Sequence, residues 1–243
     1  MRERLDIRLV ALGLAPSREK AQRFILAGSV TVNGQLAAKA SQTVDESALV
    51  AVVAGEKFVS RGGQKLEAAL TAFAVPCPGA VCVDLGASTG GFTDCLLQHG
   101  AARVHAVDVG HGQLDWKLRQ DARVVIHDEC NARHLVPGTI GEPADVLTLD
   151  VSFISLTKVL PAAVALLKPG GYLVALIKPQ FEAGKKDVKK GGVVRDSAVH
   201  ERVKTDITKF AVENLGLRLL GLIESPLRGP AGNVEFLIGL IKP

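Results

Sequence analysis

The stretch "VDLGASTGGF", residues 83 to 92, ends an apolar strand with an acid, Asp84, and then turns through glycines into a helix. Gly86, Gly90 and Gly91 would let a ligand approach the backbone closely, and the start of the helix offers free N–H groups. The GxGxxG spacing of a dinucleotide site is absent. Asp84 would repel a pyrophosphate, but it suits a ligand with an ammonium group, such as the methionine part of S-adenosylmethionine.

Strands and helices alternate on both sides of this turn. Repeated βαβ units predict an α/β fold with a parallel, doubly wound, Rossmann-like sheet that is covered on both faces. The last two apolar runs follow each other without a helix, so we expect a hairpin that makes the final strand antiparallel. The seven apolar runs lie at residues 80–86, 103–109, 123–128, 145–151, 171–179, 217–224 and 233–241, and the helical patterns lie near 91–99, 155–167 and 197–214.

Two further strand ends carry acids. Asp108 ends the second strand at about the place where a carboxylate accepts hydrogen bonds from ribose hydroxyls. Asp128 ends the third strand, and Asn131 follows it as a candidate contact to an adenine. Each acid could instead be a loop residue that caps a helix. The candidate cofactor-binding residues are Asp84, Gly86, Ser88, Thr89, Gly90, Gly91, Phe92, Asp108, Asp128, Asn131 and Phe153.

The N-terminal part of the chain has a different pattern. Helical patterns cover residues 4–13 and 17–28, where Ser17 is a good N-cap and Gly28 a plausible C-cap. The segment "VTVNGQLAAKASQTV" then predicts a hairpin, because Asn33-Gly34 is a tight-turn sequence. Two helices and a small sheet make a compact α+β unit.

This N-terminal stretch resembles the S4 RNA-binding domain family. The pieces RLD, LG-L, SR-x-x-A and G-x-V-x-V-N-G occur in the family's order between residue 3 and about residue 54. The resemblance implies RNA binding through the helix pair and the hairpin rim, although any one cation could be a solvated surface charge. We therefore expect an S4-like RNA-binding domain over residues 1–59 and a larger domain over 60–243. The candidate phosphate contacts are Arg4, Arg18, Lys20, Arg23 and Lys39.

Composition limits the other classes of function. The 243 residues are 47% hydrophobic, 22% charged and only 4% aromatic, so an RNA platform of stacked rings is not expected. The four cysteines form no CxxC pair and the six histidines are scattered, which indicates neither a metal site nor a disulfide framework. No apolar run reaches the roughly 18 residues of a membrane span. We expect a cytoplasmic protein that binds no metal and no membrane.

Two lysines and two acids stand at unusual places. The stretch "SRGGQKLEAAL" puts Lys65 in the first turn of an amphipathic helix, where the helix dipole usually favours acids. Asp150 and Lys178 each end a strand, and Glu235 lies inside the apolar run of the last strand. A buried charge is costly unless it is paired. The four side chains could pair if the fold brings them together, whereas a surface position for Lys65 is the alternative.

In this order the four residues resemble the K-D-K-E tetrad of the FtsJ-like ribose 2'-O-methyltransferases. The segments "DLGASTGGFTD", "DVSFISL", "IKPQFEAGKKDVKKGGVVRD" and "SPLRGPAGNVEF" resemble the TlyA family, and the match spans nearly the whole chain. The resemblance implies S-adenosylmethionine-dependent 2'-O-methylation of cytidine in ribosomal RNA, either as free RNA or in a ribosomal subunit. The chain stops directly after the last strand, as in the shorter members of the family, so the resemblance favours 23S RNA, with 16S RNA as the second candidate.

The residue types suit this chemistry. A ribose hydroxyl must lose its proton as it attacks a methyl group, and a lysine acts as the base only when it is neutral, which burial and a second ammonium favour. We expect Lys178 to be the base and Asp150 to orient it. Lys65 would supply the second positive charge and hold the substrate, and Glu235 would position a lysine or the ribose.

The loop at residues 181–196 is basic and rich in glycine, as expected of a segment that contacts a phosphate backbone, but it could equally be a solvated loop. Its candidate RNA contacts are Lys185, Lys186, Lys189, Lys190 and Arg195. We expect a monomer, with a homodimer as the alternative. The alternative function is an RNA-binding or pore-forming, haemolysin-type protein without methyltransferase activity.

Overall fold

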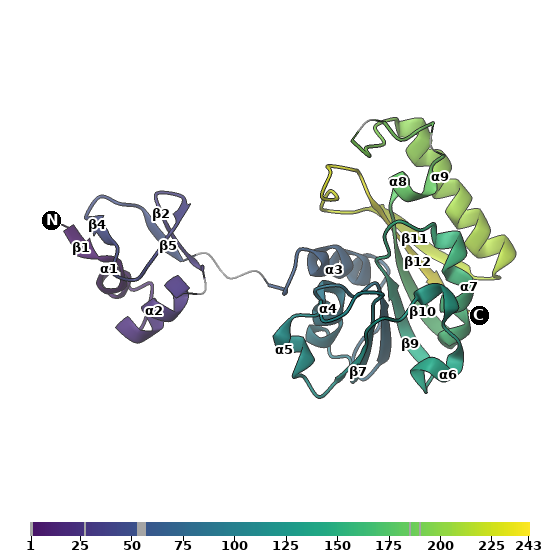
Figure 1. Ribbon diagram of the computed structural model, residues 1–243, viewed down its shortest axis with the longest axis horizontal. Helices are drawn as coiled ribbons and strands as arrows, with labels where there is room; N and C mark the ends of the chain where they lie inside the picture. The colour runs from purple at the N-terminus through teal and green to yellow at the C-terminus, as the bar shows by residue number, and fades with distance from the viewer. Residues whose placement is uncertain (1, 27, 53–56, 185, 190) are drawn as a thin grey trace. The chain divides into compact units, whose positions relative to one another are not determined.

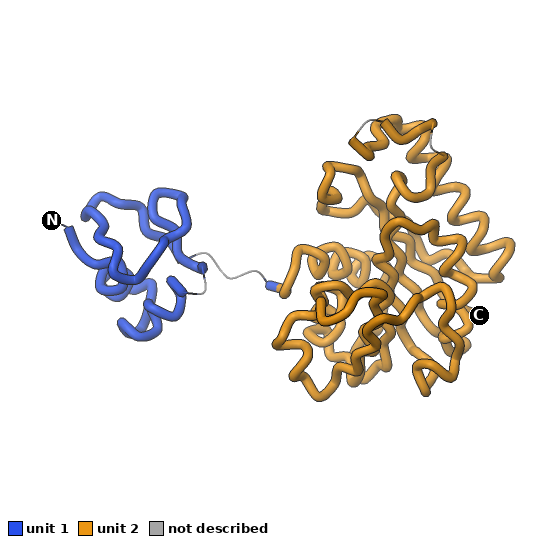
Figure 2. The backbone as a smooth tube through the Cα atoms, in the orientation of Figure 1, with its two compact units in different colours: residues 1–57 blue, residues 58–243 orange. Residues whose placement is uncertain are grey.

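The computed structural model describes residues 2–26, 28–52, 57–184, 186–189 and 191–243. The chain divides into two compact units, Met1–Lys57 and Phe58–Pro243, which Figure 2 shows in blue and orange. The division predicted from the sequence, between residues 59 and 60, lies two residues further along the chain.

The N-terminal unit combines two helices with short strands (Figure 1). β2 and β3 form the hairpin predicted around Asn33-Gly34. β5 pairs with the other edge of β2, and β1 pairs with β4, two pairings that the sequence pattern did not predict. The elements are β1 (Arg2–Arg4), α1 (Leu5–Ala11), α2 (Arg18–Leu26), β2 (Val30–Val32), β3 (Gln35–Leu36), β4 (Thr43–Asp45) and β5 (Val50–Val52).

Both N-terminal helices lie within their predicted ranges. α1 begins at Leu5 because the residues before it pair as β1. Ser17 caps α2, since its Oγ accepts a hydrogen bond from the backbone N–H of Lys20 at 3.2 Å. Gly28 follows with a φ of +67°, the left-handed conformation that suits glycine after a helix. The apolar stripes of the two helices meet in a small core around Leu9.

The C-terminal unit contains a seven-stranded sheet in the order β11-β12-β10-β9-β6-β7-β8. β12 pairs antiparallel with both β10 and β11, and the other pairs are parallel. The predicted doubly wound sheet with an antiparallel last strand is confirmed. The strands are β6 (Val81–Leu85), β7 (Arg103–Val107), β8 (Val124–His127), β9 (Ala144–Leu149), β10 (Leu167–Ile177), β11 (Arg218–Glu224) and β12 (Phe236–Ile241).

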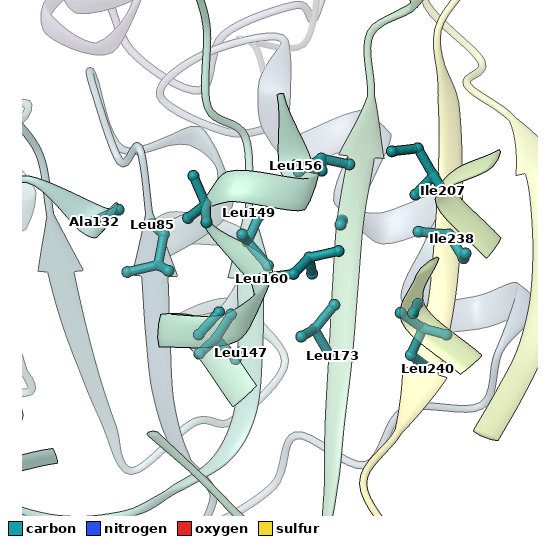
Figure 3. Close-up of a cluster of buried hydrophobic side chains, with 14 of the residues drawn as sticks. Leu85, Ala132, Leu147, Leu149, Leu156, Leu160, Leu173, Ile207, Ile238 and Leu240 are labelled. Carbon is teal, nitrogen blue, oxygen red and sulfur yellow. The ribbon is translucent and has the colours of Figure 1, made fainter. Parts of the chain in front are cut away.

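Helices cover both faces of this sheet. Along β10, Leu173 and Ala175 pack in one core cluster, whereas Val174 and Leu176 pack in the other, so alternate residues are buried on opposite faces. Figure 3 shows the first cluster, in which strand residues such as Leu173 meet helix residues such as Leu160. α3 and α4 contribute to the second cluster.

The helices of this unit explain two differences from the predicted pattern. The helix predicted over 155–167 is interrupted, because a 3-10 turn precedes α7 and β10 already begins at Leu167. The helix predicted over 197–214 continues from α9 into a π-helical end. The helices are α3 (Gly62–Ala72), α4 (Gly91–Gln98), α5 (Trp116–Arg119), η1 (Ala132–His134), α6 (Pro137–Ile140), η2 (Leu156–Lys158), α7 (Leu160–Leu166), α8 (Pro179–Glu182), α9 (Ser197–Lys209) and η3 (Phe210–Asn214).

Among the described residues, no helix is long and apolar enough to cross a membrane.

Candidate active site

Three neighbouring strands bring three of the tetrad residues to one edge of the sheet. Asp150 directly follows β9, and Lys178 directly follows β10. Ile177 pairs with Phe236 across β10 and β12, so the next residues along this antiparallel ladder are Lys178 and Glu235. The carboxyl ends of parallel strands are the place where open α/β sheets bind ligands.

The tetrad forms two ion pairs. Lys65 Nζ lies 2.6 Å from Glu235 Oε2, and Lys178 Nζ lies 2.6 Å from Asp150 Oδ1. Lys178 also donates a hydrogen bond to Ser152 Oγ at 2.8 Å. Glu235 is only 1% exposed, and a charge buried to that degree is tolerated because Lys65 pairs with it. The structure thus brings together the four side chains that the sequence predicted, with both lysines buried.

Glycines let the first turn of α3 approach the first turn of α4. A Cβ atom on Gly91 would lie 2.2 Å from Ser60 Oγ and 3.0 Å from the backbone nitrogen of Gly63. A Cβ atom on Gly63 would lie 2.2 Å from the Phe58 ring. The close packing of these backbones accounts for Gly91, which was predicted to approach a ligand. It also holds the start of α3, and with it Lys65, against the sheet.

A pocket of about 390 Å³ opens beside Lys178 and Asp150. Five of the predicted cofactor residues line it, together with Asp150 and Ser152 of the tetrad region. Gln113, Cys130 and several apolar residues complete the wall. A pocket of this size with a few polar groups fits a small organic cofactor. The predicted residues in the lining are Gly86, Ser88, Asp108, Asn131 and Phe153.

The pocket floor is built from constrained backbone. A Cβ atom on Gly86 would lie 2.6 Å from the carbonyl oxygen of Asp150, and Gly86 has a φ of +83°, so no other residue fits there. Asp108 accepts hydrogen bonds from the backbone N–H groups of Ser88 and Gly110, both at 2.8 Å. These bonds fix the carboxylate at the wall of the pocket, where it could also accept hydrogen bonds from a ribose.

Asp84 lies beneath the pocket rather than in its wall. Its two carboxylate oxygens accept hydrogen bonds from Thr93 Oγ1 at 2.7 Å and Thr148 Oγ1 at 2.9 Å. The pKa of Asp84 is raised to about 7, chiefly by complete burial and also by the nearby charge of Asp150, while the hydroxyl donors partly oppose the rise. The side chain therefore supports the strand–helix turn from below.

The remaining predicted cofactor residues lie outside the pocket lining. Gly90 has a φ of +96° and packs against Leu118, where a Cβ atom would lie 2.3 Å from that side chain. Phe92 is buried in the core under α4, and Thr89 is exposed. Asp128 accepts a hydrogen bond from the backbone N–H of Gly112, which lowers the pKa of its carboxyl group.

A second pocket of about 520 Å³ shares Phe153 with the first. Phe153 is 90% exposed and has a φ of +63°, an unusual conformation for a bulky residue. Its ring centroid lies 5.0 Å from that of Phe181, and Lys178 Nζ lies 6.0 Å from the Phe181 centroid. Arg133 and Lys158 also line this pocket. Phe181 is half-buried, so Phe153 is the exposed ring of the pair, and an exposed aromatic ring with nearby cations can bind a nucleotide.

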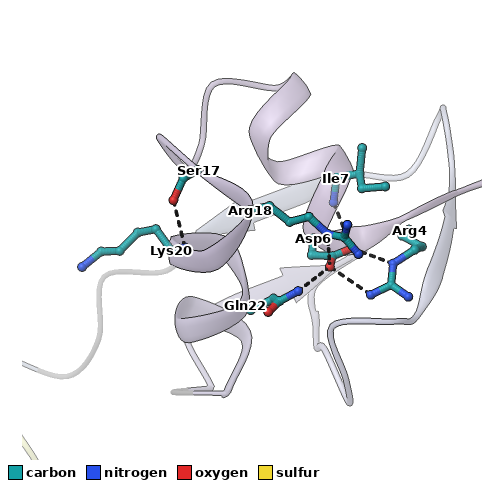
Figure 4. A network of polar contacts seen from close by, with 7 residues as sticks. All are labelled: Arg4, Asp6, Ile7, Ser17, Arg18, Lys20 and Gln22. Carbon is teal, nitrogen blue, oxygen red and sulfur yellow. Dashed lines mark hydrogen bonds and ion pairs between the residues drawn. The ribbon is translucent and has the colours of Figure 1, made fainter.

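In the N-terminal unit, two of the predicted RNA contacts, Arg4 and Arg18, donate hydrogen bonds to the buried Asp6 (Figure 4). Asp6 has no exposed surface, and its carboxylate accepts hydrogen bonds from Arg4 at 2.9 and 3.0 Å and from Arg18 at 2.9 Å. Gln22 donates a further bond to it at 2.8 Å. The Arg4 guanidinium, followed by these other donors, holds the pKa of Asp6 well below its usual value. Arg4 and Arg18 therefore stabilise the fold, while about half of each side chain stays exposed.

The other predicted N-terminal cations differ in their partners. Arg23 pairs with Glu19 on the same face of α2 at 2.6 Å, and Lys20 Nζ lies 5.3 Å from the centroid of the Phe24 ring. Lys39 is exposed and makes no side-chain contact among the described residues. Lys39 is thus the cation of this unit that is best placed to meet an external anion.

The predicted basic loop is only partly described. Lys185 and Lys190 lie outside the described residues. Lys186 and Lys189 are exposed, and Lys189 pairs through its backbone with Val193. Arg195 is exposed at the rim of a separate pocket.

Sequence reasoning missed several residues that hold the site. Ser152 lies in the quoted segment "DVSFISL" without having been assigned a role, although its place next to Asp150 was a usable signal. Thr93 and Thr148 could not be found, because their bonds to Asp84 depend on the fold. No group of three or more histidine, cysteine or acidic side chains in the described part of the chain could hold a metal ion.

Two family models match the chain. The model described as FtsJ-like methyltransferase matches residues 58–242, and the S4 domain model matches residues 3–50. The 16S/23S rRNA (cytidine-2'-O)-methyltransferase TlyA of Mycobacterium tuberculosis is 48% identical over 98% of this chain and 90% of its own length. Hemolysin A of Brachyspira hyodysenteriae is 42% identical over 98% of this chain and 99% of its own length. The solved structure of a Streptococcus thermophilus protein described as a hemolysin has a TM-score of 0.76 and 44% identity, covering 99% of this chain and 88% of that one.

Proposed function

Because the chain belongs to the TlyA group of FtsJ-like methyltransferases, we propose that it methylates the ribose 2'-oxygen of a cytidine in ribosomal RNA, using S-adenosylmethionine. The observation that carries this proposal is the meeting of Lys65, Asp150, Lys178 and Glu235 in two ion pairs beside one pocket. 23S RNA is the favoured substrate, and 16S RNA is the second candidate.

The residues of the pocket fit S-adenosylmethionine. Asp108 offers a fixed carboxylate to a ribose, and Asn131 offers an amide to an adenine. Gly86 has no side chain, so a ligand can approach the backbone closely there. Asp150 lines the pocket, while its buried Oδ1 faces Lys178 Nζ at 2.6 Å. When bound, the cofactor supplies an electrophilic methyl group on a sulfonium.

Lys178 is the group proposed to take the proton of the ribose hydroxyl. Its Nζ contacts Asp150 and Ser152, and both of these residues line the pocket. The contacts therefore hold Nζ next to the pocket wall. As the neutral amine, Nζ would accept the proton of the 2'-hydroxyl while the bond between the 2'-oxygen and the methyl carbon forms and the methyl carbon–sulfur bond breaks, which would leave S-adenosylhomocysteine. A fixed base of this kind contributes about 10²- to 10⁴-fold to the rate.

Lys65 and Glu235 form the second layer of the same site. The buried Glu235 holds Lys65 at 2.6 Å, and Lys178 stands next to Glu235 on the neighbouring strand. A second ammonium close to Lys178 favours release of a proton from the base. The pair is therefore proposed to tune Lys178 and to hold the ribose.

Several features support RNA as the substrate. The chain carries an S4 domain, and the exposed Lys39 of that domain is available to a phosphate. Phe153 and Phe181 offer an aromatic surface close to Lys178, with Arg133 and Lys158 beside it. A ribosomal substrate would also account for the cytoplasmic location expected from the sequence. The monomeric state stays a prediction.

The test is a map of 2'-O-methyl groups on ribosomal RNA from cells with and without this protein. We expect a cytidine that is methylated only in cells containing the protein, in 23S RNA and, if the second candidate also holds, in 16S RNA. Identical maps, together with no binding of S-adenosylmethionine in isothermal titration, would instead support the RNA-binding or pore-forming alternative.

A further inference from the structure

Two loops of the C-terminal unit enclose a basic pocket that is separate from the cofactor pocket. It has a volume of about 560 Å³ and is lined by residues of the segments 193–195 and 228–234 together with His200. Arg195 and Arg228 both line it, and both are exposed. Neither guanidinium forms an ion pair or a hydrogen bond within the part of the chain that the structure describes. No acid is among the described residues of the lining.

A buried asparagine ties the two loops together. Asn233 is 2% exposed, and its Oδ1 accepts a hydrogen bond from the backbone N–H of Val194 at 2.9 Å, while its Nδ2 donates one to the carbonyl of Gly192 at 2.9 Å. The carbonyl of Asn233 accepts a third bond from the N–H of Gly229 at 2.9 Å. His200 Nε2 lies 3.0 Å from the carbonyl of Val194. A buried amide whose oxygen and nitrogen both bond to the other loop helps to specify one geometry for both loops.

The same loop forms part of the tetrad site. A Cβ atom on Gly229 would lie 2.4 Å from Oε1 of Glu235, so the backbone next to Arg228 packs directly on that carboxylate. Glu235 in turn holds Lys65 at 2.6 Å. Arg228 therefore directly precedes Gly229, the residue that packs against Glu235. Its loop is held in place by this contact with the proposed active site.

Two arginines without an acid partner favour an oxyanion with several oxygens. The guanidinium fork matches a phosphate in a bidentate way, whereas it gains little from a neutral group. We propose that Arg195 and Arg228 together bind a backbone phosphate of the RNA strand, next to the nucleotide that enters the tetrad site. This inference rests on the proposed function, and it adds a phosphate subsite that orients the strand relative to Glu235 and Lys65.

The experiment compares the full-length protein with the double variant Arg195→Gln/Arg228→Gln. The probe is ribosomal RNA from a strain that lacks the methyltransferase, and its affinity is measured over a series of KCl concentrations. Each lost phosphate contact lowers the slope of log affinity against log salt by about 0.7 for single-stranded RNA, so the double variant, which loses one phosphate, should lower it by about 0.7. Affinity at low salt should fall by about tenfold or more. The KM for RNA should rise by more than kcat falls.

Two further variants make the result specific. Arg218→Gln removes an exposed arginine at the opposite end of β11 and should keep the wild-type slope. Arg195→Lys/Arg228→Lys keeps both charges, so the slope should return toward the wild-type value, while affinity stays reduced because the bidentate fork is lost. An unchanged affinity for S-adenosylmethionine verifies that the variants are folded.

A double glutamine variant with the slope and affinity of the wild type would overturn the phosphate subsite. So would an equal loss of slope in Arg218→Gln, because the effect would then reflect net charge alone. Failure of the proposed function is a different result: the wild-type protein itself would transfer no methyl group to the RNA.

Discussion

Asp6 in the N-terminal unit and Asp84 in the C-terminal unit are both aspartates without exposed surface. Asp6 receives hydrogen bonds from two arginines, which hold its pKa well below the usual value. Within the described part of the chain, the donors to Asp84 are neutral groups of Thr93 and Thr148, and burial raises its pKa to about 7. The same residue type thus stays charged where cations surround it and tends to hold a proton where only neutral donors do.

The cations in the two units differ in the same way. Arg4 and Arg18 turn inward to neutralise Asp6, but each remains about half exposed. Lys65 and Lys178 are buried, and each pairs with an acid at the edge of a pocket. The N-terminal cluster therefore stabilises its unit, whereas the C-terminal cluster is the one proposed to act on a ligand. Substitutions in the N-terminal cluster should therefore lower stability, whereas substitutions in the C-terminal cluster should lower the rate of methyl transfer.

The largest effect is expected for Lys178→Ala. Removing the proposed base should lower the rate of methyl transfer by about 10³-fold, while binding of S-adenosylmethionine and the free energy of unfolding change little. Lys168→Ala is the matched control, because Lys168 lies near the opposite end of β10. Its Nζ pairs with Asp145 at 2.7 Å, and both side chains are partly exposed. That control should keep its rate. Methyl transfer at a normal rate by Lys178→Ala would remove the distinction between the clusters.

A stability effect is expected for Asp6→Ala. The variant leaves Arg4 and Arg18 without their shared acceptor, and breaking a buried ion pair costs about 3 kcal/mol. Hydrogen exchange of α1 and α2 in the full-length protein should speed up, with no change in the C-terminal unit. Asp45→Ala is the control, since its pair with Arg2 is exposed and contributes about 1 kcal/mol or less. Equal exchange rates in the two variants would contradict the structural role of Asp6.

The pH dependence of stability should have opposite signs for the two aspartates. Because the pKa of Asp84 is raised to about 7, the folded protein holds its proton more tightly than the unfolded chain does, so stability falls as pH rises from 3.8 to about 7. Because the pKa of Asp6 is lowered, its contribution is present above the usual pKa and is lost as pH falls below it.

Denaturant unfolding of the wild type and of Asp84→Asn at several pH values measures the pH-dependent contribution of Asp84 to stability. The stability of the wild type relative to this variant should decline across that pH interval and level off above it. A difference that instead grows with pH would mean that Asp84 is ionised in the folded protein, as Asp6 is.

The smallest effect is expected on RNA binding by the S4 domain, where Lys39 and Arg18 should behave differently. Lys39→Gln removes a cation without an intramolecular partner among the described residues and should lower the salt slope of RNA binding by about 0.7. Hydrogen exchange of the unit should not change. Arg18→Gln should weaken RNA binding and also speed exchange, because it loses its bond to Asp6. If both variants change the slope alone, Arg18 is an RNA contact and not a structural residue.

Much of the fold and the tetrad could be predicted from the sequence. Apolar runs ending in Asp84, Asp108 and Asp150 mark strand ends, and in a parallel sheet strand ends meet at one edge. Glu235 could be placed with a lysine because a charge inside an apolar strand needs a partner. Both inferences depend on general costs of burial and not on the details of packing.

The partners of individual side chains could not be predicted. The pairing of Arg4 and Arg18 with Asp6 depends on how two helices meet, and an arginine in a basic stretch carries no sign of whether it turns inward. The close approach of Gly91 to the Gly63 backbone could not be predicted for the same reason, and its role toward a ligand stays a prediction. β1 and β4 were missed since three-residue strands show no alternating pattern.

The most direct test is a structure of this protein with S-adenosylhomocysteine and a short RNA that contains the mapped cytidine. We expect the ribose 2'-oxygen to lie within about 3.2 Å of Lys178 Nζ, with the sulfur in the pocket lined by Gly86 and Asp108. A 2'-oxygen bound away from Lys178, or a cofactor held outside that pocket, would contradict this expectation.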